Sequence, residues 1–216
     1  MNVAQLVEPR IVVPVVVGSS PIVHPIIIML FIISGPSGVG KGTLIKLYLE
    51  KSKHCVLSTS ATTRTPRIGE VNGIDYYFKS NAEFDTHIKN NDFLEWCTVH
   101  TNRYGTLKSD IQKKLTLSPA VIVEIDVQGA KKIKQHTDFP QHHIFVAPPS
   151  LDILEQRLRT RNTEDEANLV KRLKQAHQEL LEKPNYDSII VNNELTQSTI
   201  ELDNVILSIL TKGVTQ

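Results

Sequence analysis

The sequence predicts an α/β fold in which a five-stranded parallel sheet is covered by helices on both faces. The first observation is that, from Met29 onward, short β-branched runs alternate with longer stretches whose apolar residues recur with a helical period. The second is that the short runs are apolar at almost every position, as in strands buried on both faces. The third is the length of 216 residues, which suffices for one compact core with smaller lobes.

The elements follow in order along the chain. The predicted strands span 30–34, 55–59, 121–126, 144–147 and 188–191. The predicted helices begin near Lys41 and lie near 81–91, 151–161 and 164–182. Ser80 and Thr163 each stand three residues before a glutamate, a spacing that satisfies free amide groups at a helix start, and Ser150 is placed to cap the helix after it.

Residues 60–110 interrupt this alternation. They are polar, aromatic and turn-rich around the stretch GEVNGIDYYF, so they predict an inserted lobe. The core is then expected to comprise 29–59, 111–150 and 183–216, with a separate helical segment at about 151–182.

Composition excludes several classes of protein. The formal net charge is +1, from 24 basic and 23 acidic side chains, which argues against the broad positive surface that nucleic acids require. Cys55 and Cys97 match no metal-ligand or disulfide spacing, and two cysteines fit a reducing, cytoplasmic compartment. Any bound anion is therefore expected to be small and held locally.

The first 28 residues differ from the rest. Pro14, Pro21 and Pro25 interrupt their apolar run, which argues against a membrane span, while a signal peptide remains a weak alternative. When back-translated, residues 3–8 and 18–21 resemble the D-arm and T-arm of a transfer-RNA gene. We therefore expect a mis-assigned start with Met29 as the true initiator; a loosely attached extension is the alternative.

A glycine-rich loop joins the first predicted strand to the first helix. Gly35, Gly40 and Lys41 satisfy the pattern G-x-x-x-x-G-K in the required strand-to-helix context. Such a loop turns backbone N–H groups and a helix N-terminus toward phosphates, and its lysine reaches the β- and γ-phosphates. Gly42 stands where this motif usually carries a hydroxyl for Mg²⁺, with Thr43 one place later, so the direct metal ligand stays open.

The stretch 58–78 indicates a second site. Arg64 and Arg67 could clamp an anion bidentately, although a solvated basic turn is the ordinary alternative. Further polar groups are embedded among strand-like residues, namely Glu95, Tyr104, Thr106, Glu124 and Asp126. Together these residues suggest a second anionic ligand.

These stretches resemble the guanylate kinases. The resemblance runs from about Phe31 to the C-terminal helix and rests on GPSGVGKGT, TTRTPR with GEVNG and DYYF, VEIDVQG, APPS and the RL..R.TE pattern that starts at Arg157. It implies a three-layer P-loop kinase fold with a GMP-binding lobe and a helical lid. It also implies transfer of the γ-phosphoryl of ATP to GMP, with Mg²⁺ as cofactor, in purine nucleotide metabolism.

On the positions that match the family's motifs, the resemblance implies a donor site, an acceptor site and a lid. ATP would bind Gly35, Pro36, Ser37, Gly38, Val39, Gly40, Lys41, Gly42 and Thr43. GMP would bind through Ser60, Glu95 and Asp126 at the base and through Arg64, Arg67, Tyr76 and Tyr104 at the phosphate, with Glu70, Thr106 and Glu124 as supporting groups. The catalytic set would be Lys41 and Arg64 with the lid arginines Arg157, Arg161 and Arg172, and Mg²⁺ would bind through ATP phosphates and water.

The chemistry of Glu95 agrees with GMP as acceptor. An ionised carboxylate only accepts hydrogen bonds, which suits guanine N1–H and N2–H₂ and mismatches adenine, and such readout can discriminate by about 10⁴. Two alternatives stay open: a catalytically inactive guanylate-kinase-like scaffold that binds peptides, which the intact Lys41 disfavours, and a kinase for another nucleoside monophosphate. The lid arginines could also belong to an ordinary charged helix, since Glu155 and Arg159 have the i,i+4 spacing. We expect a stand-alone cytoplasmic enzyme, monomeric or homodimeric, that binds neither nucleic acid nor membrane.

Overall fold

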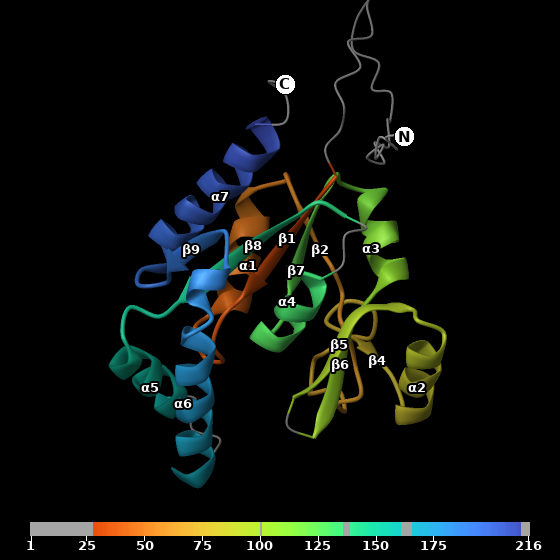
Figure 1. Ribbon diagram of the computed structural model, residues 1–216, viewed down its shortest axis with the longest axis horizontal. Coiled ribbons are helices and arrows are strands. Elements are labelled where there is room, and N and C mark those ends of the chain that lie inside the picture. Colours follow the sequence, from red (N-terminus) through yellow and green to blue (C-terminus); the bar gives the residue numbers. More distant parts are fainter. Residues whose placement is uncertain (1–27, 100, 136–138, 161–165, 213–216) are drawn as a thin grey trace, which may run out of the picture.

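The computed structural model describes residues 28–99, 101–135, 139–160 and 166–212 (Figure 1). The predictions on residues 1–27, on Arg161 and on Thr163 fall outside these ranges. In the described part of the chain, no helix is long and apolar enough to cross a membrane.

A five-stranded parallel sheet forms the centre of the molecule, as predicted. Its strands lie in the order β2-β7-β1-β8-β9. Their bounds are β1 Met29–Ser34, β2 Val56–Leu57, β7 Ala120–Glu124, β8 Gln141–Ala147 and β9 Ser188–Val191. Because all five strands are parallel, the carboxyl ends of β1, β7 and β8 meet at one edge, with Ile33 paired to Glu124 and Ser34 to Phe145.

Strand β2 is shorter than the predicted 55–59. Ser58 N still donates to Ile122 O of β7 at 2.9 Å. The chain then leaves the ladder, because Thr59 N donates to the Asp110 carboxylate at 2.8 Å instead of to β7. A side chain from the neighbouring lobe thus replaces the next backbone partner.

Alternating side chains on β1 divide the core in two. Phe31 and Ile33 pack against α1 (Lys41–Lys51) and α7 (Leu195–Lys212) on one face. Leu30 and Ile32 pack on the other face against α3 (Lys108–Leu115) and α4 (Val127–Ile133). Strand side chains alternate between faces, so an all-apolar strand requires cover on both sides, and these four helices supply it.

A second, four-stranded sheet lies within residues 60–110. Its order is β4-β3-β6-β5, made of β3 Ala61–Thr62, β4 Tyr77–Phe78, β5 Phe93–Val99 and β6 Asn102–Leu107. Helix α2 (Asn81–Lys89) covers it through Phe84, which packs on Phe93 with ring centroids 4.5 Å apart. The predicted cap of this helix is confirmed, since Ser80 Oγ accepts from Glu83 N and Glu83 Oε2 accepts from Ser80 N.

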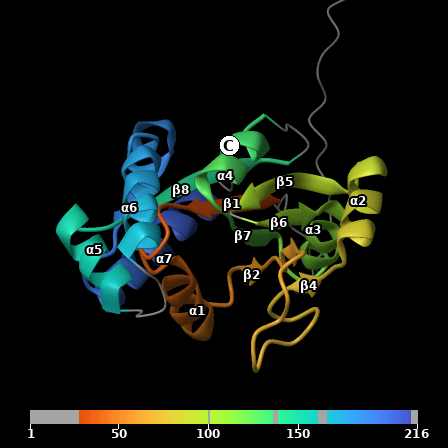
Figure 2. The same cartoon turned by 90° about the horizontal axis from the view of Figure 1, so that it is seen from below.

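Two helices follow β8 and stand on the opposite side of the sheet's carboxyl edge from the small sheet (Figures 1 and 2). They are α5 (Leu151–Thr160) and α6 (Glu166–Leu180), and a 3₁₀ turn, η1 (Lys183–Asn185), leads from α6 back to β9. Leu154, Leu158 and Leu169 form their shared apolar contact. These two helices and the small sheet flank the edge where β1 and β7 end.

Candidate active site

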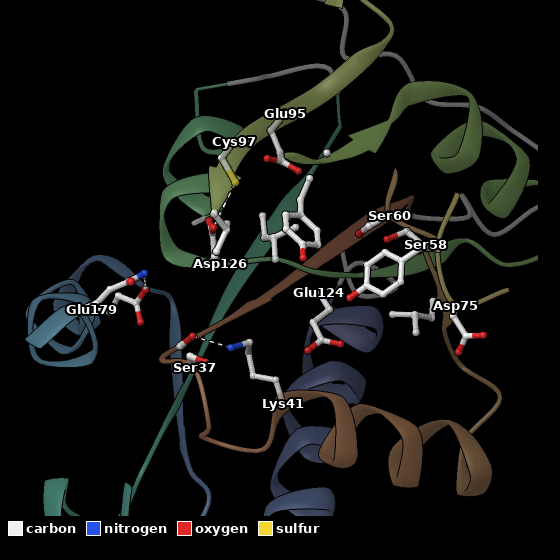
Figure 3. Close-up of a pocket in the computed structure, with 18 of the residues that line it drawn as sticks. Ser37, Lys41, Ser58, Ser60, Asp75, Glu95, Cys97, Glu124, Asp126 and Glu179 are labelled. Atoms are coloured by element: carbon white, nitrogen blue, oxygen red, sulfur yellow. Dashed lines mark hydrogen bonds between the residues drawn. The ribbon is translucent and has the colours of Figure 1, made fainter. Parts of the chain in front are cut away.

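A cavity of about 330 Å³ lies between the glycine-rich loop, the small sheet, the end of β7 and helix α6 (Figure 3). Its walls therefore bring together residues predicted for the donor site, the acceptor site and the lid. The predicted residues that line it are Gly35, Ser37, Lys41, Ser60, Tyr76, Glu95, Tyr104, Glu124, Asp126 and Arg172. Other predicted site residues lie within the described ranges but do not line the cavity: Pro36, Gly38, Val39, Gly40, Gly42, Thr43, Arg64, Arg67, Glu70, Thr106 and Arg157.

The glycine-rich loop follows β1 directly and requires glycine at both ends. A Cβ at Gly35 would lie 2.2 Å from the backbone oxygen of Val146. Gly40 has φ +93° and precedes α1, so the loop enters the helix through a left-handed residue. Lys41 Nζ donates to Gly35 O at 2.6 Å and to Pro36 O at 3.2 Å, which holds the ammonium over the loop.

Gly42 faces a carboxylate. A Cβ built on Gly42 would lie 3.6 Å from each carboxylate oxygen of Glu124, at the end of β7. Burial raises the pKa of Glu124, and the charge of Lys41 opposes this shift. Thr43 is exposed, whereas the Glu124 carboxylate lies beside the position where the usual motif carries its hydroxyl.

Two carboxylates meet at the opposite end of the cavity. Glu95 on β5 is 5% exposed and accepts from Thr106 Oγ1 at 2.9 Å. Asp126 caps α4 and accepts from Gly129 N at 2.7 Å. Burial raises the pKa of Glu95 to about 7, helped by the charge of Asp126 and opposed by the Thr106 hydrogen bond. A Cβ at Gly129 would lie 2.9 Å from Glu95 Oε2, so glycine here leaves room for the Glu95 carboxylate beside Asp126.

The predicted phosphate-binding residues lie on the β3–β4 connection and on β6. Arg64 forms an ion pair with Glu70 at 2.7 Å and lies over the Tyr76 ring, 5.3 Å from its centroid. Glu70 also accepts from Arg67 N at 2.7 Å, which fixes the turn between the two arginines. The Tyr76 and Tyr104 rings are 6.1 Å apart, edge to face. Arg64 is thus oriented by its neighbours, whereas Arg67 is exposed.

The described lid arginines contact the loop in two ways. Arg172 Nη2 donates to Ser37 Oγ at 2.9 Å. Arg157 donates to Val39 O at 3.3 Å and to Asn192 O at 2.9 Å, while Asn192 Nδ2 also donates to Val39 O at 2.8 Å. The Arg157 contacts hold the back of the loop rather than face the cavity.

Sequence reasoning missed five cavity residues with polar or thiol side chains: Ser58, Asp75, Cys97, Gln175 and Glu179. Gln175 and Glu179 lie three and seven residues after Arg172 on the predicted helix 164–182, so helical periodicity could have placed all three on one face. Gln175 Nε2 donates to Glu179 Oε1 at 2.9 Å. Burial raises the pKa of Glu179. No pattern marked Cys97, because a single cysteine among strand residues reads as a buried thiol.

The carboxylates here do not form a preassembled metal cage. Within the described ranges, no group of three or more histidine, cysteine or acidic side chains is placed to hold a metal ion. Divalent cations in sites that bind nucleoside triphosphates are usually held by one or two carboxylates together with the phosphates.

The family model described as "Guanylate kinase" matches residues 28–209. A guanylate kinase of Prochlorococcus marinus is 43% identical over 180 residues, covering 83% of this chain and 97% of its own. A guanylate kinase of a Synechocystis species is 45% identical over 178 residues, covering 82% and 92%. Among solved structures, the guanylate kinase from Anaplasma phagocytophilum matches with a TM-score of 0.67 and 28% identity, covering 84% of this chain and 85% of that one.

Proposed function

The chain belongs to the guanylate kinase family and transfers the γ-phosphoryl group of ATP to GMP, and we propose that the cavity described above is where it does so. The observation that carries this assignment is the pairing of two features in one cavity. The loop with Lys41 can hold phosphates at one end, and the buried Glu95 carboxylate can accept from a guanine edge at the other.

We assign the acceptor end to GMP. Ser60, Glu95 and Asp126 would contact the base, with Thr106 holding Glu95 from behind. Tyr76 and Tyr104 face the cavity and would bind the GMP phosphate, together with Arg64 and Arg67 once the β3–β4 connection closes over it. Glu70 is a positioning residue in this assignment, because it orients the Arg64 guanidinium without lining the cavity.

We assign the loop residues 35–43 to ATP. Successive backbone N–H groups and the start of α1 would surround the phosphates, and Lys41 would leave its carbonyl contacts to neutralise charge on the transferring group. Arg172 would add a second positive charge from the lid. Arg157 would act by fixing the loop through Val39 O, and the role of Arg161 stays a prediction.

Mg²⁺ is the proposed cofactor, and when bound it would neutralise charge on the ATP phosphates. The donor set fits such an ion, since the Glu124 carboxylate lies beside Gly42, where the usual motif carries its hydroxyl. We therefore propose that Glu124 would hold Mg²⁺, directly or through water.

The protein's own contribution to transfer is position and charge. Phosphoryl transfer needs little covalent chemistry from side chains, so no general base is required. The loop and the acceptor site would align the two phosphates, and closure of the lobe at 60–110 and the lid at about 151–182 would exclude water that hydrolyses ATP. We further propose a cytoplasmic enzyme of purine nucleotide metabolism that acts as a monomer or homodimer.

A coupled assay for ADP tests the function with each nucleoside monophosphate in turn. We expect turnover with GMP and at least about 10³-fold lower kcat/KM with AMP, CMP and UMP, because a site that reads a base by hydrogen bonds rejects mismatched edges strongly. Equal use of AMP and GMP would overturn the assignment of Glu95 to the guanine edge.

A further inference from the structure

Cys97 occupies an unassigned place in the acceptor end of the cavity. It lies on β5, opposite Tyr104 of β6, is 5% exposed and lines the cavity. Its Sγ donates to Asp126 Oδ2 at 3.2 Å, and Figure 3 shows the two side chains pointing toward each other. The thiol therefore contacts one of the two carboxylates proposed to read guanine.

This contact completes the set of groups that hold Asp126. The other carboxylate oxygen, Oδ1, accepts from Gly129 N at 2.7 Å. With one donor on each oxygen, the plane of the carboxylate is fixed, whereas a single donor would leave rotation about the Cβ–Cγ bond free. Glu95 is held comparably by the Thr106 hydroxyl.

We propose that Cys97 is a positioning residue for guanine recognition, whose S–H group orients the Asp126 carboxylate toward the base. This inference rests on the proposed function of the cavity. Cys97 acts through Asp126 and need not touch the nucleotide.

The surroundings of the sulfur keep it a donor. Burial, together with the charges of Asp126 and Glu95, raises the pKa of the Cys97 thiol well above its usual range, so the proton stays on sulfur. A thiol is a weaker donor than a hydroxyl, but its acceptor here is a carboxylate, and hydrogen bonds to charged acceptors are the stronger class. A serine at this position would keep a donor, and an alanine would remove it.

The test uses three variants of the full chain. Cys97→Ala removes the donor, Cys97→Ser keeps it, and Cys55→Ala controls for loss of a buried thiol outside this cavity. Each is assayed for kcat and KM with GMP and with IMP, which keeps N1–H but lacks the 2-amino group. GMP affinity is also measured directly by titration calorimetry, and folding is followed by thermal denaturation.

We expect Cys97→Ala to raise the KM and Kd for GMP about 5- to 20-fold, with kcat and the KM for ATP within about twofold of wild type. The preference for GMP over IMP should fall about fivefold, because an unconstrained Asp126 contributes less to reading the base edge. Cys97→Ser should restore both values, and Cys55→Ala should leave both unchanged.

Wild-type GMP affinity and GMP-to-IMP preference in Cys97→Ala would overturn the inference, as would a serine variant as impaired as the alanine variant. These failures are distinct from failure of the proposed function, which would appear as a wild-type enzyme that does not phosphorylate GMP.

Discussion

The Glu95 carboxylate is deeply buried beside the negative charge of Asp126, and both raise its pKa. Since GMP would bind the ionised form, protonation of Glu95 should compete with GMP binding. Thr106 accounts for one hydrogen bond to its carboxylate, and Asp126 lies close enough to add to the rise in its pKa. The cavity that it lines offers guanine N1–H and N2–H₂ an acceptor only while the carboxylate is ionised.

We expect GMP affinity to fall as the pH drops below 7. Burial raises the pKa of Glu95 to about 7, so below that pH the free site holds a proton that GMP must displace. Each further pH unit should then raise the Kd about tenfold, and above pH 8 the effect should vanish. Titration calorimetry from about pH 5.5 to 8.5, on both sides of the Glu95 pKa, would measure the Kd for GMP as a function of pH.

Glu95→Gln supplies the control, since it removes the titrating group and leaves only the GMP phosphate, whose second pKa is about 6. A wild-type profile that coincides with that of Glu95→Gln in shape would contradict the prediction.

Lys41 is held by the loop that it serves. Its ammonium donates to two carbonyl groups of the same loop. Methionine is an unbranched side chain of similar length, so Lys41→Met should remove the charge and these hydrogen bonds while keeping most of the bulk. We expect kcat to fall at least about 100-fold, as for loss of one preorganised charge-stabilising group, with the Kd for GMP unchanged. Steady-state kinetics together with calorimetry separate the two effects, and near-normal turnover would remove Lys41 from the catalytic set.

At the scale of single elements, two glycines after β1 test where the strand-to-helix turn requires glycine. Gly35 is crowded by the neighbouring strand, whereas Gly42 has room for a side chain. Gly35→Ala would place its Cβ 2.2 Å from Val146 O on the neighbouring strand β8. Gly42→Ala would meet nothing nearer than the Glu124 oxygens at 3.6 Å, inside the first turn of α1.

We therefore expect Gly35→Ala to lower the free energy of unfolding by about 3 kcal/mol, through a steric clash and backbone strain. Gly42→Ala should leave it unchanged or raise it by about 0.5–1 kcal/mol, through helix propensity. Urea denaturation of both variants provides the comparison. Equal destabilisation by the two substitutions would show that the close approach to Val146 is not what requires glycine at position 35.

Elements with a uniform pattern were the predictable ones. The core strands could be predicted because each is an apolar run, and α2 because Ser80 and Glu83 have a local spacing with a fixed geometry. The expected burial on both faces was wrong for β9, which lies at the edge of the sheet and leaves Ile189 and Val191 43% and 44% exposed.

The end of β2 could not be predicted, because the Asp110 carboxylate that captures Thr59 N comes from 51 residues away. Cys97 was missed for the same reason, since its partner Asp126 comes from a distant segment. Glu179 is different, because it lies on a predicted helix whose periodicity could have placed it beside Arg172.

For the whole molecule, the small sheet and the α5–α6 pair lie on either side of the cavity, and the chain enters each of them from the carboxyl end of a central strand, β2 or β8 (Figures 1 and 2). Arg64 and Arg157 do not line this cavity, although the family resemblance assigns both to phosphates. Movement of the two lobes toward each other would bring Arg64 to the acceptor phosphate.

We accordingly expect the radius of gyration to decrease when both sites are filled. Small-angle scattering with GMP and a non-hydrolysable ATP analogue should give a smaller value than the free enzyme, since both lobes would close on the ligands. The Lys41→Met variant with the same two ligands is the control. At equal occupancy its radius of gyration should decrease less, because the loop lacks the Lys41 ammonium that would attract the phosphates and the closing lobes. An unchanged radius in the doubly liganded wild type would contradict lobe closure.

The pairing of β1 with β7 has a consequence for how precisely two substrates can be aligned. Ile33 and Glu124 are partners in the same ladder, so the loop that follows one strand and the carboxylates that follow the other have a fixed separation along the sheet. Neighbouring rungs of a ladder are about 3.3 Å apart, comparable to the distance across which the phosphoryl group must pass, and a slip of one rung would also reverse the faces of the side chains. The backbone hydrogen bonds between β1 and β7 thus help to determine whether donor and acceptor can come within reacting distance.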